Sequence, residues 1–140
     1  MKFSFMILFL IFNGLISSCF AQKIYIIKVG ERSMEVASDD LPFGYGADVE
    51  GKLITWEKAM TMCEEKGNGW RLPTLIELRA IYMQVHKTGE DRFESDWYWS
   101  GTKNDDNDAW GFHFEYGIAN NQYYDFKRSK KYGRAVRDLP

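Results

Sequence analysis

The stretch of sequence that most resembles a metal site is the acidic run Asn104-Asp105-Asp106-Asn107-Asp108. Asn104, Asp106 and Asp108 stand at positions 1, 3 and 5 of a loop in which Glu115 falls at position 12, the spacing of an EF-hand calcium loop. Position 6 is Ala109, where the sharp turn of that loop needs glycine, and the residues that follow alternate like a strand. We therefore interpret the run as a solvated loop tip, with a calcium site of another geometry as the weaker alternative.

His113 and Glu115 lie two residues apart in a predicted strand, so we expect both side chains on one face. A metal site or an acid–base pair could use that spacing, but we identify no third ligand and no nucleophile. The sequence also lacks a Ser/His/Asp order, a phosphate-binding glycine loop and an H-E-x-x-H motif. We predict no catalytic residue, no metal and no cofactor, and interpret the pair as part of a solvated sheet face.

The late part of the chain is rich in side chains that suit adaptable binding. Between Trp97 and Arg137, 13 of 41 residues are Asn, Asp or Tyr, and they concentrate in loops that include Tyr116. Tyr offers a flat apolar ring with a polar tip, and amides adapt their hydrogen bonds, a mixture that suits sugar rings and protein surfaces. The predicted ligand-binding residues are Asn104, Asp106, Asn107, Asp108, His113, Glu115, Asn120, Asn121, Tyr123 and Tyr124. The alternative is that Asn and Asp only form turns here.

Composition limits the class of protein. The 140 residues suffice for one domain, and 16% aromatic residues with three prolines exclude a disordered or collagen-like chain. Eighteen basic against 20 acidic residues argue against a nucleic-acid partner. Two cysteines are too few for a disulfide scaffold or a cysteine-built metal site. Six basic residues near the C-terminus predict a solvated face with at most weak attraction for anionic glycans: Lys127, Arg128, Lys130, Lys131, Arg134 and Arg137.

The N-terminus has the order of a secretory signal peptide. Lys2 precedes an apolar run, Phe3 to Ile16, that is shorter than the ~20 residues a bilayer requires. Cleavage after Cys19-Phe20-Ala21 would leave Gln22 first, whereas Ile16-Ser17-Ser18-Cys19 reads as a lipobox whose cysteine carries a lipid. We predict residues 1–21 as the leader, residues 22–140 as one domain, and a secreted or cell-envelope location. A lipid on Cys19 would be its only link to the membrane.

Two helices are predicted between strands. The first covers Trp56 to Lys66, with Thr55 as cap, Gly67 as stop and a buried stripe of Trp56, Ala59, Met60 and Cys63. The second follows a capping box, Thr74 with Glu77, and fades near His86. Strands are expected at 23–29, 34–37, 97–99, 110–115, 123–126 and 132–136, with loops at 41–51, 103–108 and 117–122. This order indicates an α+β fold.

The segment Trp70-Arg71-Leu72-Pro73-Thr74 is predicted to determine the fold. We expect Trp70 and Leu72 to be buried and Arg71 to pair with a carboxylate or carbonyl. Replacing Trp70 by Ala should then cost about 3–5 kcal/mol, and Thr74→Ala about 1 kcal/mol through the lost cap.

Five blocks of sequence, taken in order, resemble one bacterial family. They are Thr55-Trp56-Glu57-Lys58-Ala59 with Cys63, Gly69 to Thr74 with Glu77-Leu78, Tyr98-Trp99-Ser100 with Thr102, Ala109-Trp110 with Phe114 and Gly117, and Arg134-Ala135-Val136-Arg137. Together they resemble the C-terminal domain of the Lcl collagen-like surface adhesin, which is close to the Fibrobacter succinogenes major paralogous domain. The similarity covers about residues 34–138.

This resemblance implies a C-type-lectin-like fold, related to formylglycine-generating enzymes, in which two helices pack on a twisted antiparallel sheet. It also implies an exported domain, or one on a cell or phage surface, whose later loops form a surface. Most members of the family have no assigned ligand. The chain lacks the E-P-N-type motif and disulfides of sugar-binding C-type lectins and the paired late cysteines of the enzymes. The sequence therefore predicts a non-enzymatic binding or adhesion module for a glycan or protein. The alternative is a structural subunit of a surface or phage-derived assembly.

Overall fold

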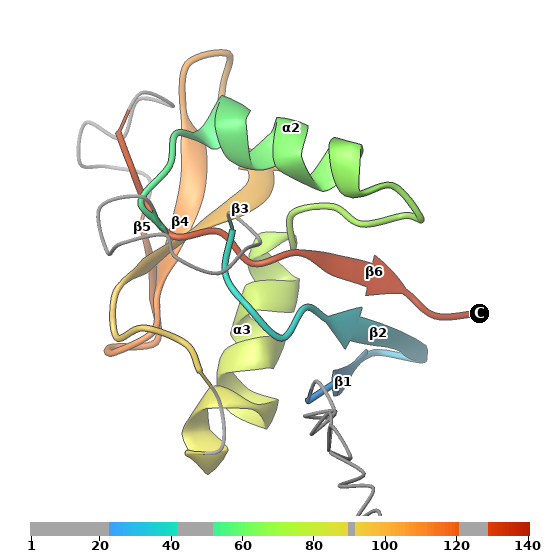
Figure 1. Cartoon of the computed structure of the whole chain (residues 1–140). Coiled ribbons are helices and arrows are strands. Elements are labelled where there is room, and N and C mark those ends of the chain that lie inside the picture. Colours follow the sequence, from blue (N-terminus) through green and yellow to red (C-terminus); the bar gives the residue numbers. More distant parts are fainter. Residues whose placement is uncertain (1–22, 42–51, 90–91, 121–128) are drawn as a thin grey trace, which may run out of the picture.

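The computed structural model describes residues 23–41, 52–89, 92–120 and 129–140 (Figure 1). Within these ranges the elements follow in the order β1 (Tyr25–Val29), β2 (Arg32–Val36), α2 (Trp56–Lys66), α3 (Leu75–Gln84), the 3-10 helix η1 (His86–Thr88), β3 (Trp97–Lys103), β4 (Ala109–His113), β5 (Ile118–Asn120) and β6 (Val136–Asp138). The predicted α+β class is confirmed. The predicted leader, residues 42–51 of the predicted early loop, and the predicted strand at 123–126 lie outside the described residues.

The strands form two antiparallel three-stranded sheets, in the orders β1-β2-β6 and β3-β4-β5. Gly30, at a φ of 63°, forms the tight turn that joins β1 to β2. β6 returns from the end of the chain to pair with β2, so that Glu35 lies opposite Arg137. The first sheet therefore joins the early and late parts of the chain, while the second is built from consecutive strands (Figure 1).

Both helices have the bounds that their caps predict. In α2 the Thr55 side chain accepts from the backbone N–H of Lys58, and Gly67 ends the helix at a φ of 66°. In α3 the Thr74 hydroxyl accepts from the N–H of Glu77, while the Glu77 carboxylate accepts from the N–H of Thr74. These local bonds satisfy donors that a helix start leaves free.

Two hydrophobic cores lie on opposite sides of β3. Because neighbouring strand residues point to opposite faces, Tyr98 enters the core beneath α3 and Trp99 enters the core beneath α2. Cys63 is a buried free thiol in the second core, as its place on the α2 stripe predicts. Strand β3 is thus packed on both sides.

Three strand predictions need correction. Residues 117–122 were expected to be a turn, but Ile118–Asn120 is strand β5 and pairs with β4. β5 has little buried apolar surface, so no apolar alternation marks it. β4 ends at His113 rather than continuing to residue 115. The closing strand is Val136–Asp138, whereas Tyr132, the first residue of the predicted strand, makes only an isolated bridge with Tyr98.

Candidate ligand-binding surface

The acidic run lies at the exposed tip between β3 and β4. One carboxylate oxygen of Asp105 accepts from the backbone N–H groups of Asn107 (2.7 Å) and Asp108 (2.8 Å). The backbone N–H of Asn104 bonds to the carbonyl of Asp108 at 3.0 Å. Asp105 therefore shapes the turn, while Asn104, Asp106 and Asn107 stay exposed. Across the described ranges, no group of three or more His, Cys, Asp or Glu side chains converges on one point.

His113 and Glu115 do not share a strand face. The chain leaves β4 after His113 and enters a turn, where Gly117 takes a φ of 66° and its N–H bonds to the His113 carbonyl. The backbone N–H of Glu115 donates to Nδ1 of His113 at 3.2 Å. Since an accepting Nδ1 carries no proton, a neutral ring holds its proton on Nε2. The expectation of a paired face was wrong because the turn begins earlier than the alternation suggested.

The outer face of the β3-β4-β5 sheet carries a set of three rings, Trp97, His113 and Tyr116, which we call the aromatic row. Trp97 and His113 are partners in the β3-β4 register, with ring centroids 4.9 Å apart and planes at 85°. His113 stacks on Tyr116 at 4.7 Å and 28°. Trp97 is half-buried, His113 nearly buried, and Tyr116 is 63% exposed. The row therefore leads from the interior to solvent, and each ring is fixed by its neighbour.

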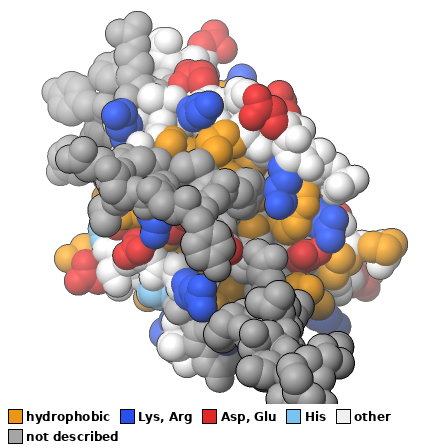
Figure 2. Space-filling view, in the orientation of Figure 1, with side chains coloured by type: hydrophobic (Ala, Val, Ile, Leu, Met, Phe, Trp, Pro, Cys, Tyr) orange, Lys and Arg blue, Asp and Glu red, His pale blue; other side chains and the backbone are white. Residues whose placement is uncertain are grey.

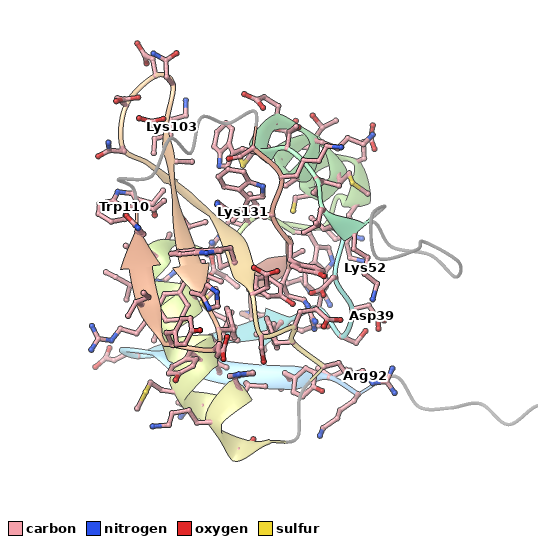
Figure 3. All side chains as sticks on the ribbon, turned by 90° about the vertical axis from the view of Figure 1, so that its left-hand side faces the viewer. Asp39, Lys52, Arg92, Lys103, Trp110 and Lys131 are labelled. Atoms are coloured by element: carbon pink, nitrogen blue, oxygen red, sulfur yellow. The ribbon has the colours of Figure 1, made fainter. Side chains whose placement is uncertain are left out.

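Lys131 holds the inner end of this row. Its ammonium lies 5.2 Å from the Trp97 ring centroid and 5.1 Å from that of Trp99. Its stem crosses Gly111, where an added Cβ would lie 3.2 Å from both Lys131 Cε and Trp97 Cε3. Gly111 is therefore part of the packing that lets Lys131 lie flat. In Figure 3, Lys131 lies between Trp110 and α2.

The remaining predicted ligands divide into two groups. Asn120 lies opposite Gly111 in the register, on the same face as the aromatic row, and Ile118 lies opposite His113. The negative charge of Glu115 and its hydrogen bond with Tyr116 raise the pKa of the Tyr116 hydroxyl. Asn121, Tyr123 and Tyr124 lie outside the described residues. The structure therefore brings His113, Glu115 and Asn120 together with Tyr116 and places the acidic run at a separate loop tip.

Two of the basic residues expected on a solvated face are buried. Lys131 is 6% exposed, and the Arg134 side chain is fully buried. The Arg134 guanidinium donates to Asp40 (2.7 Å) and to the carbonyls of Ala37, Ser38 and Arg92, and it lies 4.0 Å from the Phe93 ring. Burial raises the pKa of Asp40, and the Arg134 charge opposes that rise. The partners of Arg134 are distant in sequence, so its charge alone gave no indication of burial.

A second ion network joins the start of α3 to β6. Arg71 donates to both carboxylate oxygens of Glu77, at 2.7 and 3.0 Å, and Arg32 donates to the same carboxylate at 3.3 Å. The backbone of Arg71 also exchanges two hydrogen bonds with Val136. Burial acts to raise the pKa of Glu77, but the hydrogen bonds from Arg71 and Thr74 and the two arginine charges outweigh it and lower that pKa.

Trp70 is less buried than predicted. Leu72 is 3% exposed, but Trp70 is only half-buried and lies between two cations, the Lys66 ammonium at 5.0 Å and the Arg137 guanidinium at 4.8 Å. Cation–π contacts at such sites contribute about 0.5–1 kcal/mol each. We therefore lower the expected cost of Trp70→Ala to about 1–2 kcal/mol. The ring lies between two cations and packs against the edge of the core beneath α2 rather than inside it.

No single sign of charge dominates the face shown in Figure 2, where acidic and basic side chains alternate with apolar ones. Among the described residues, no helix has the length and apolar character needed to span a bilayer. The molecule is an α+β domain in which the last ring of the aromatic row, Tyr116, is largely exposed. Residues 32–137 match the model of the Lcl C-terminal domain, and the chain belongs to that family. No curated protein matches it.

Proposed function

We propose that this protein is an exported, non-enzymatic binding module that holds a glycan or protein ligand on the aromatic row and the loops beside it. The observation that carries the proposal is the continuous row of ring contacts, edge-to-face between Trp97 and His113 and stacked between His113 and the exposed Tyr116. Rings fixed before binding lose little entropy when a ligand arrives. A ring face accepts the C–H surface of a sugar or an apolar side chain, and Asn120 adds an amide on the same face.

Export is supported by the N-terminal pattern and by family membership. N-terminal sequencing of the protein recovered from cell fractions tests it. We expect a chain that starts at Gln22 or Cys19 outside the cytoplasm. A cytosolic product that keeps Met1 would contradict it.

The binding proposal is tested by an array of glycans and proteins probed with the purified protein. We expect Tyr116→Ala and Trp97→Ala to weaken whichever contact the parent shows. Ile76→Ala is the matched control, because Ile76 is 72% exposed on α3, away from the row. Equal binding by both row variants and the control would refute the proposal. Tyr123 and Tyr124 were also predicted to bind the ligand, and replacing both by alanine should weaken binding while leaving the melting temperature nearly unchanged.

A further inference from the structure

β1 is the outer strand of its sheet, and one part of its free edge is already occupied. The Gln84 side chain of α3 accepts from the backbone N–H of Lys28 at 2.9 Å and donates to its carbonyl at 2.7 Å. This amide therefore acts as a one-residue substitute for a neighbouring strand. Its position also shows that the backbone groups of Lys28 point away from β2.

Within the described ranges, the rest of this edge has no neighbouring strand. In an antiparallel pair, alternate residues direct their backbone groups to the partner or away from it. The outward groups of Lys28 therefore imply outward groups at Ile26 and, one step further, at Ile24. Among the residues that the structure describes, nothing bonds to these groups. Ile24 is 63% and Ile26 61% exposed, so apolar side chains accompany an unpaired edge, the combination that invites another strand.

A groove of about 270 Å³ runs along this open stretch. One wall is formed by Lys23 and Ile24 with the first two residues of β1, and the other by Gln84, Val85 and Thr88 at the end of α3 and in η1. A strand placed against Ile24 and Ile26 could set alternate side chains into this space. Because the Gln84 side chain already bonds to the backbone of Lys28, pairing with the added strand would end before that residue.

The surrounding charge indicates what kind of strand fits. Exposed Lys23 and Lys28 flank the two isoleucines, and exposed Lys87 lies beside Thr88. The nearest carboxylate across the sheet, Glu35, is held by Arg137 at 2.6 Å. If a second copy of β1 paired with this edge, Lys23 and Lys28 would approach the lysines of that copy. Like charges that face each other across a strand pair oppose pairing. Carboxylates on the incoming strand would meet these lysines favourably.

We propose that an extended peptide segment, apolar at its centre and acidic toward its ends, adds to β1 as a fourth strand of the β1-β2-β6 sheet. Main-chain hydrogen bonds to Ile24 and Ile26 supply the pairing, and the groove accepts alternate side chains, as in strand addition generally. This site is formed by other strands than the aromatic row, so the two proposals succeed or fail independently.

The probe is a fluorescent seven-residue peptide of alternating valine and threonine with a glutamate at each end. Binding is followed by fluorescence anisotropy, and hydrogen exchange is followed at Ile24 and Ile26. We expect both amides to exchange more slowly with peptide present. The same peptide with lysine ends, or with alternate amides N-methylated, should bind about tenfold more weakly, the equivalent of about 1.4 kcal/mol.

Ile26→Pro tests the same edge from the protein side. Proline removes a donor that faces outward, a place where edge strands tolerate it. We expect about tenfold weaker binding, within what one lost main-chain bond explains. Ile76→Ala is again the control. Equal binding of the lysine-ended or N-methylated peptide to the parent overturns the proposal, even if Ile26→Pro fails to fold. So does a concentration-dependent dimer that Ile26→Pro abolishes, because the occupant is then a second copy.

Discussion

The two faces of the β3-β4-β5 sheet carry similar side chains in different surroundings. On the inner face Tyr98, Phe112 and the adjoining Phe114 are at most 2% exposed and contact one another at centroid distances of 4.8 to 5.5 Å. On the outer face Trp97, His113 and Tyr116 are just as close, yet Tyr116 is 63% exposed. The difference shows that ring contacts alone do not define a core: coverage by a helix does, by α3 over Tyr98 and Phe112 and by α2 over Trp99.

The largest effect should come from the inner face. Phe114 is fully buried and stacks on Phe93 with centroids 4.5 Å apart. Phe114→Ala should lower the free energy of unfolding by about 3–5 kcal/mol, because it leaves a cavity among rigid rings. Urea denaturation measures this. If Phe114→Ala lowered the free energy of unfolding no more than Tyr116→Ala does, the two faces would not differ in their contribution to stability.

Replacing Glu77 tests whether losing the ionic contacts beside the inner core costs as much stability as losing a packed ring. Glu77→Gln should cost about 2–3 kcal/mol near neutral pH, because hydrogen bonds from two arginines lose their charged acceptor. The lowered pKa of Glu77 means that, as pH falls, the unfolded chain takes up the proton first. Parental stability should therefore decline as pH falls from about 4.3 toward the folded-state pKa. Denaturation across the acid range should show that the difference in free energy of unfolding between parent and variant shrinks as pH falls. A difference that stays constant would contradict this.

The hydroxyl groups of Tyr98 and Tyr116 provide a second comparison between the inner and outer faces. The Tyr98 hydroxyl donates to Asp40 at 3.0 Å and accepts from the Glu94 N–H at 2.9 Å, and burial raises the pKa of Tyr98. Tyr98→Phe should cost about 1–2 kcal/mol through unsatisfied buried partners. The same change at Tyr116 should have almost no effect on thermal unfolding. Similar losses at both positions would mean that burial does not control the outcome.

The smallest effect on stability is expected for the outer ring itself. Tyr116→Ala should change the free energy of unfolding by less than about 0.5 kcal/mol, as surface replacements usually do. Chemical denaturation of this variant and the parent gives the comparison. A loss above 1.5 kcal/mol would assign Tyr116 to the core, and any binding defect would then have a structural explanation.

Local signals in the sequence were sufficient for the helices. Thr55, Gly67 and the Thr74–Glu77 box act on neighbours a few residues away, so the bounds of α2 and the start of α3 could be predicted. Strand β6 was displaced because its pairing depends on β2, a distant partner in sequence. Strand β5 pairs with its neighbour β4 and was missed for another reason. A strand with little buried surface has no apolar pattern to reveal it.

The candidate site was predictable only in part. His113 and Asn120 were among the expected ligands, and Tyr116 was noted within the loops, but Trp97 and Lys131 were not identified as site residues. Trp97 resembled any strand aromatic, since its register with His113 is fixed only by the folded sheet. Lys131 resembled a solvated cation, and nothing local indicates that it crosses Gly111 between two indoles.

The pairing of β2 with β6 also determines when the molecule can fold. Glu35 and Arg137 are separated by 102 residues, yet they lie side by side in one sheet. During synthesis, β2 lacks this neighbour until residues 136–138 have been made. Contacts between such distant segments slow folding, because a long loop must close before they form. Residues 136–138 therefore control when the first sheet can form, and a ribosome stalled shortly before Val136 would hold a chain without its finished first sheet.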